Sequence, residues 1–83
     1  MMTKKERQFI DDMIRCRGMN FPRLGMIVEV YGDIGTIAGM NDSANLDVVF
    51  ANQQKYGRHK HNCHPNESIK YFDGEGNLIA AYE

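Results

Sequence analysis

The sequence predicts a mainly β (α+β) domain in which an N-terminal amphipathic helix packs on a five-stranded antiparallel barrel. Two observations carry this prediction. Up to residue 17 the apolar residues recur at helical spacing, and from residue 25 onward they alternate with polar residues between glycine-rich turns. Short strands joined by glycine turns are typical of a small, strongly bent sheet that closes on itself.

The length of 83 residues leaves room for a single domain. Its composition, 42% hydrophobic and 25% charged, is that of an ordinary globular protein. We expect residues 1–23 to form the helix and a linker, and residues 24–83 to form the barrel. A domain of this size buries only about 60% of its unfolded surface, so a deep substrate pocket would compete with its core for volume. The size therefore disfavours an elaborate enzyme.

The predicted helix covers residues 3–17. Thr3 and Glu6 have the spacing of a capping box, and Gly18 is a natural left-handed stop. One apolar stripe at helical spacing should close an end of the barrel: Phe9, Ile10, Met13 and Ile14. The same stripe is a candidate contact for a homodimer or for a partner protein.

Five strands are predicted after the helix, at residues 27–30, 36–38, 46–50, 68–72 and 78–82. The stretch 46–50 is the clearest, because it is rich in β-branched and aromatic residues. Residues 41–45 and 73–77 are polar or glycine-rich and should be turns. The predicted core of the barrel is Val28, Val30, Ile37, Leu46, Val48, Phe50, Ile69 and Leu78.

The pattern around the first two strands resembles that of KOW/SH3-like small barrels, roughly G-x-x-V-x-V-x-G-x-x-G-x-I. The matching residues are Gly25, Val28, Val30, Gly32, Gly35, Ile37 and Gly39, followed by the strand 46–50. Residues 25–82 also resemble short proteins of bacteriophages and prophages. The resemblance implies an SH3-like barrel that binds RNA, a ribosomal surface, a modified tail or a protein partner. Asp33 stands where ribosome-associated KOW domains usually carry basic residues, which argues against RNA binding by this turn.

The N-terminal sequence MMTKKERQF is charged, and no apolar run approaches the ~18 residues of a membrane span. We therefore expect no secretory signal, no membrane partner and a cytoplasmic location, which is the host cytoplasm if a phage encodes the chain. Cys16 and Cys63 are then expected to be reduced thiols.

Charge is segregated along the chain although the net charge is only −1. Residues 55–70 hold four Lys/Arg and one acid, whereas residues 24–54 hold four acids and no Lys/Arg. Cationic side chains bind phosphates, and aromatic rings stack on bases. The sequence thus predicts a nucleic-acid or partner surface, mainly on the long connection after the third strand, made of Lys55, Tyr56, Arg58, His59, Lys60, His61 and Lys70.

A second hypothesis uses the opposite charge. Four acids could give the barrel an acidic face that occupies or inhibits a host protein: Glu29, Asp33, Asp42 and Asp47. The N-terminal helix is the other candidate surface for such a protein partner.

A zinc site is a third hypothesis, and otherwise no cofactor is implied. His59, His61 and Cys63 would share one face of an extended segment, with His64 or Cys16 as the fourth ligand, but no paired second half of a zinc motif is present. Catalysis is not predicted, because Cys63 and His64 are adjacent and should project to opposite sides of a strand. The glycines between residues 32 and 39 also lack the Lys-Ser/Thr ending of a phosphate loop.

Overall fold

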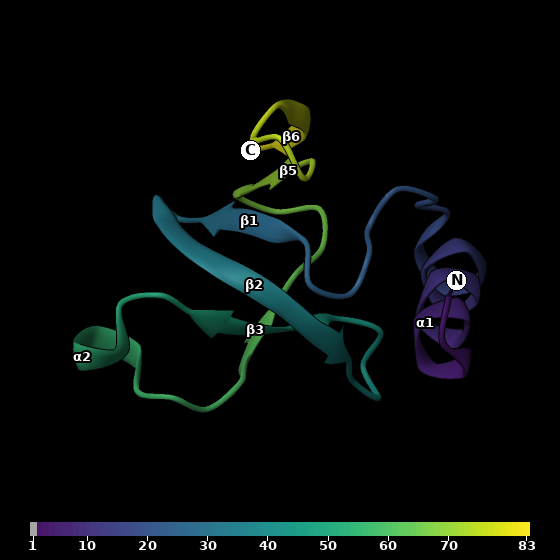
Figure 1. Ribbon diagram of the computed structural model, residues 1–83, viewed down its shortest axis with the longest axis horizontal. Coiled ribbons are helices and arrows are strands. Elements are labelled where there is room, and N and C mark those ends of the chain that lie inside the picture. Colours follow the sequence, from purple (N-terminus) through teal and green to yellow (C-terminus); the bar gives the residue numbers. More distant parts are fainter. Residues whose placement is uncertain (1) are drawn as a thin grey trace.

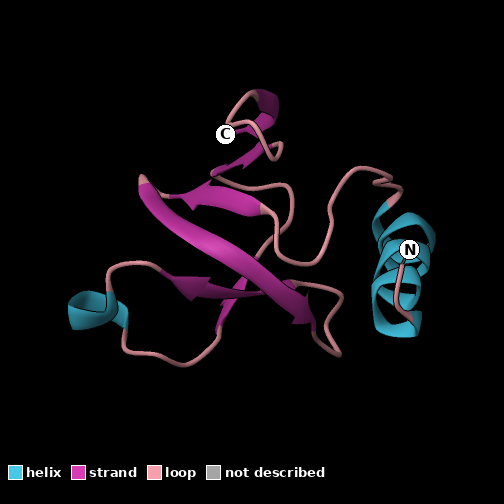
Figure 2. Cartoon of the chain, in the orientation of Figure 1, coloured by secondary structure: helices cyan, strands magenta, loops and turns pink. Residues whose placement is uncertain are grey.

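The computed structural model describes residues 2–83 as a helix beside one curved sheet (Figures 1 and 2). The elements along the chain are α1 Lys4–Arg17, β1 Ile27–Val30, β2 Asp33–Met40, β3 Leu46–Phe50, α2 Gln53–Tyr56, β4 His61–Cys63, β5 Ile69–Phe72 and β6 Leu78–Tyr82. All strand pairs are antiparallel, in the order β4-β3-β2-β1-β5-β6. The domain is therefore α+β, as predicted.

The prediction of five strands and a closed barrel is not confirmed, because the sheet has six strands and is open. The additional strand is β4, which pairs with β3 and lies in the stretch expected to be a connection. Closure of a barrel requires the two edge strands to pair with each other. Within residues 2–83, β4 pairs only with β3 and β6 pairs only with β5.

Helix α1 begins with the predicted capping box. The Thr3 hydroxyl accepts the Glu6 N–H at 3.1 Å, and the Glu6 carboxylate accepts the Thr3 N–H at 3.0 Å. Phe9 and Met13 are buried, but the prediction that Ile14 joins the core is wrong, since 47% of it is exposed. The helix stands beside the sheet (Figure 1), so only a narrow stripe of its surface is covered. Neither helix described in residues 2–83 has the length and hydrophobicity needed to cross a membrane.

One side of the sheet holds the core. Seven of the eight strand residues predicted for it are buried, namely Val28, Val30, Ile37, Leu46, Val48, Phe50 and Ile69. The prediction is wrong for Leu78, which is 55% exposed, and Tyr71 is fully buried in the core. A register shift in the β5–β6 pair places Leu78 opposite Phe72, on the other side of the sheet from Tyr71.

Tight backbone geometry shapes the β1–β2 hairpin. Tyr31 and Gly32 have φ angles of 50° and 86°, the left-handed values of a two-residue type I′ turn. Further along, Gly35 faces β3 so closely that a Cβ there would lie 2.5 Å from Cγ1 of Val48. These two features bring β1, β2 and β3 together as the curved centre of the sheet.

Candidate functional site

The basic segment, residues 55–64, is folded against one end of the core. Helix α2 carries Tyr56, whose ring stacks on that of Phe50 with 4.1 Å between the ring centroids. His61 of β4 meets both rings edge-on, at 5.7 Å from Phe50 and 5.4 Å from Tyr56. Phe50 is buried, so these contacts extend the hydrophobic core into the segment. The aromatic ring predicted to stack on bases is engaged within the chain.

A carboxylate binds the same segment. The Tyr56 hydroxyl donates a hydrogen bond to Asp33 at the start of β2, and Lys55 Nζ lies 3.0 Å from the same carboxylate. These two contacts lower the pKa of Asp33, with the Tyr56 hydrogen bond as the larger cause. In return, the Asp33 hydrogen bond raises the pKa of Tyr56 and that of Lys55. One of the predicted phosphate-binding cations is thus already paired.

The remaining predicted residues divide into exposed and engaged groups. Lys70 lies on β5 and its ammonium is 3.6 Å from the Glu29 carboxylate. Arg58 and Lys60 are exposed and form no ion pair with any acid of the described chain. They are the cations of the basic segment that could bind a phosphate without first breaking an internal contact.

The histidines and the cysteine do not come together as a metal centre. Nε2 of His61 lies 2.7 Å from the carbonyl oxygen of Tyr56, an arrangement that fits an Nε2–H donor. The His59 ring lies 4.4 Å from that of His61, while His64 is exposed and Cys63 is buried. Burial raises the pKa of the Cys63 thiol, which disfavours the thiolate that binds metals. Among residues 2–83, no three His, Cys, Asp or Glu side chains are grouped so that they could hold a metal ion.

The four acids predicted to form one acidic face are distributed over the molecule. Glu29 lies opposite Ile34 in the β1–β2 ladder, and its carboxylate forms an ion pair with Lys70 of β5. Asp33 instead faces α2. Asp42 is exposed in the β2–β3 loop, and Asp47 on β3 accepts a hydrogen bond from Asn41 at 3.3 Å. They do not form a single continuous surface.

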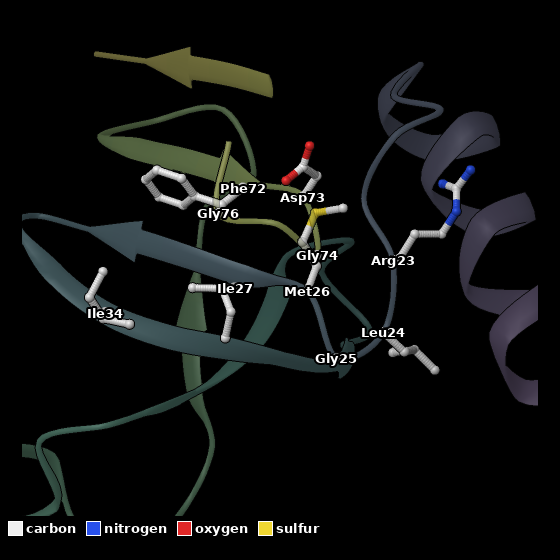
Figure 3. A pocket seen from close by; sticks show the side chains of 10 residues that line it. All are labelled: Arg23, Leu24, Gly25, Met26, Ile27, Ile34, Phe72, Asp73, Gly74 and Gly76. Carbon is white, nitrogen blue, oxygen red and sulfur yellow. The ribbon is translucent and has the colours of Figure 1, made fainter. Parts of the chain in front are cut away.

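The side of the sheet opposite the core carries several exposed apolar side chains. We call it the open face and define it by residues that share this side through the strand registers: Ile27, Glu29, Ile34, Lys70, Phe72 and Leu78. Ile27 and Ile34 are 41% and 43% exposed. Figure 3 shows Ile27, Ile34 and Phe72 on the same side of the ribbon. In the part of the chain that the structure describes, both helices lie beside the sheet and neither lies over this side of it (Figure 1).

A hollow of about 660 Å³ lies over one part of the open face. Figure 3 shows the residues that line it. Its apolar lining includes Leu24, Met26, Ile27, Ile34 and Phe72. Arg23 and Asp73, which line the same hollow, are engaged internally: the Arg23 guanidinium donates to the carbonyl oxygens of Asn20 and Pro22. The Asp73 carboxylate accepts backbone N–H groups of its own turn, chiefly that of Asn77, which lowers its pKa. The hollow is therefore an apolar surface with satisfied charges at its rim.

Sequence reasoning missed the open face, although the signal was present. In a strand with one side on the core and the other in solvent, the residues that alternate with the core residues should be polar. Ile27 alternates with the core residue Val28, and Ile34 lies opposite Glu29, so both are apolar at solvent-facing positions. Ile27 was predicted only as the first residue of a strand, and Ile34 fell outside the predicted strand 36–38, whereas β2 begins at Asp33.

Comparisons with protein-family models, with curated proteins and with solved structures found no match to this chain.

Proposed function

We propose that this chain is a small, non-enzymatic binding module that recognises a partner protein through its open face. The observation that carries the proposal is the exposure of Ile27 and Ile34, which line an apolar hollow of about 660 Å³, and of Leu78, which lies opposite the lining residue Phe72. Contiguous exposed apolar surface is unusual on small soluble proteins and marks sites of protein interaction.

The chemistry of the open face defines the partner that would fit. Met26, Ile34 and Phe72 can receive apolar side chains, and the Glu29–Lys70 pair beside them adds no net charge. The partner is therefore a protein segment that presents apolar side chains rather than a polyanion. The resemblance to phage proteins points to a protein of the host cytoplasm as that partner.

Nucleic-acid binding is the second candidate, carried by cations that the fold leaves without an acid. Lys60 of the basic segment and Lys5 of α1 line a common hollow of about 280 Å³ between the helix and the sheet. Asp12 and Asp47 line the same hollow and reduce its positive potential. We rank this candidate lower because Lys55, Tyr56 and Lys70 all have partners within the chain.

Quantitative affinity purification from a nuclease-treated host lysate tests the proposal. The bait would be the wild-type chain, Ile34→Lys on the open face and Lys60→Glu on the basic segment. A buried, unpaired lysine costs enough interaction energy to reduce recovery of a true partner by roughly tenfold or more. We expect one or more proteins to be lost with Ile34→Lys and retained with Lys60→Glu. Equal recovery of every protein with wild type and Ile34→Lys would contradict the proposal.

A further inference from the structure

The two edges of the sheet differ in how well they are protected against pairing with another strand. An edge strand exposes unpaired backbone N–H and C=O groups, and proteins usually protect it by short length, charge or proline. At one edge, β4 has three residues, Lys60 precedes it and Pro65 follows soon after it. At the other edge, β6 has five residues and contains no Lys, Arg, Asp, Glu or Pro.

The side chains of β6 are also unusually apolar for an edge strand. Its sequence is LIAAY, and Ile79 is 44% exposed beside the exposed Leu78. Within the described chain, the only strand that pairs with β6 is β5. The register shift that could distort this edge lies at the Leu78 end, so Ala80 to Tyr82 keep regular pairing with β5. The outer side of β6 is therefore available to another strand.

We propose that the free edge of β6 pairs with β6 of a second copy of this chain, antiparallel, so that two sheets join into one. The distribution of charged residues in and beside β6 favours a second copy of the chain as the partner. When β6 pairs with itself about Ala80, Ile79 lies opposite Ala81 of the other copy, and Glu83 falls opposite the neutral Asn77. No charged residue then faces a like charge across the new ladder, and like charges in that position destabilise a strand pair.

The side chains near the symmetry axis permit this approach. Ala80, which would lie on the axis, is small and half-buried, and Ala81 is small and exposed. A two-fold pair uses both β6 edges and leaves only the protected β4 edges, so assembly stops at the dimer. A ladder of five residues buries less than the ~1,600 Å² of a standard interface, so the dimer should be weak and depend on concentration.

This inference concerns the edge of the sheet and does not depend on the proposed function of its open face. Sedimentation equilibrium of the full chain tests it over a range from about 10 µM to 1 mM, the range in which weak dimers form. We expect the weight-average mass of the wild type to rise toward twice the monomer mass and no further. Ile79→Lys should keep the chain monomeric over this range, because it places an unpaired charge in the new ladder.

Ile34→Lys is the matched control, since Ile34 and Ile79 are 43% and 44% exposed and only Ile79 lies at the edge. This variant should dimerise as the wild type does while losing the partner of the open face, and Ile79→Lys should show the reverse. Ala81→Lys is a second edge variant, and circular dichroism must show that each variant is folded. A wild type that stays monomeric at 1 mM, a dimer lost with Ile34→Lys but kept with Ile79→Lys and Ala81→Lys, or growth beyond the dimer would each overturn the proposal.

Discussion

The basic segment and the open face make opposite use of their side chains. The basic segment holds three of the chain's ten Lys/Arg residues and all three of its histidines, yet Tyr56 stacks on Phe50 and binds Asp33, and His61 binds a backbone carbonyl. The open face carries isoleucines that a core could have used, yet they are exposed. A polar segment can thus be part of the structure while an apolar surface remains free to bind. A binding surface is better identified from side chains that have no partner within the chain than from the number of charged residues in a segment.

Removal of the Phe50 ring, which anchors the basic segment, should cause the largest loss of stability. Phe50→Ala removes a buried ring that contacts Tyr56 and His61, and it should cost about 3–5 kcal/mol of unfolding free energy. That loss is comparable to the whole stability of many small domains. Urea denaturation, monitored by circular dichroism, measures this loss of unfolding free energy.

Ile34→Ala provides the comparison on the open face. It shortens an exposed aliphatic side chain and should change the unfolding free energy by only about 0.5 kcal/mol. Similar losses in the two variants would mean that the open face is packed as tightly as the core.

A smaller effect is expected at the buried hydroxyl of Tyr71, which donates a hydrogen bond to the carbonyl oxygen of Pro65. This bond holds the connection that follows β4 against the core. Tyr71→Phe leaves that carbonyl without its donor and should cost about 1–2 kcal/mol. Tyr82→Phe is the control, since the Tyr82 hydroxyl forms no hydrogen bond with any described residue. Equal midpoints of urea denaturation for the two variants would show that the Pro65 contact contributes nothing.

The contact between Asp33 and α2 should appear as a pH dependence of stability. The pKa of Asp33 is lowered in the folded chain, so its contribution is present above the unfolded pKa of about 3.9 and is lost as the pH falls through the folded value. Asp33→Asn should therefore be less stable than the wild type at pH 7, and the difference should shrink in acid. Asp42→Asn, at an exposed loop acid, is the control. A constant difference between wild type and Asp33→Asn from pH 7 to pH 2 would exclude this linkage.

The smallest expected effect is a difference in oligonucleotide affinity between variants of a cation paired within the chain and variants of a cation that is not paired. If the chain binds a fluorescently labelled single-stranded oligonucleotide, Lys60→Gln should weaken binding and reduce its salt dependence, since each phosphate contact contributes to that slope. Lys55→Gln should weaken binding less, because Lys55 is paired with Asp33. Fluorescence anisotropy at several salt concentrations measures both. An equal or larger effect of Lys55→Gln would show that the Asp33 pair opens readily.

The sequence was sufficient for the parts of the fold that have a local physical cause. The capping box at Thr3, the left-handed Gly18 and the alternation around Val28 and Val48 each depend on a few neighbouring residues, and all are confirmed. The prediction was wrong where the cause is not local. The bulge beside Leu78 and the pairing of β4 with β3 depend on strand registers that single-sequence periodicity does not determine.

The contacts of the predicted site residues could not be derived from the sequence for the same reason. The sequence shows that cations are concentrated in residues 55–70, but it gave no indication that Asp33 and Glu29 would pair with two of them from other strands. It also could not show that six residues from four strands would share an uncovered face. Both facts depend on which strands become neighbours.

Hydroxyl-radical footprinting of the dilute free chain tests the central contrast most directly, with each rate normalised to the intrinsic reactivity of its residue type. The structure requires fast labelling of Ile34 and Leu78 on the open face, slower labelling of Tyr56, and the slowest labelling of Tyr71. Protection of Ile34 and Leu78 as strong as that of Tyr71, with rapid labelling of Tyr56, would show that the open face is covered and the basic segment is free, contrary to this account.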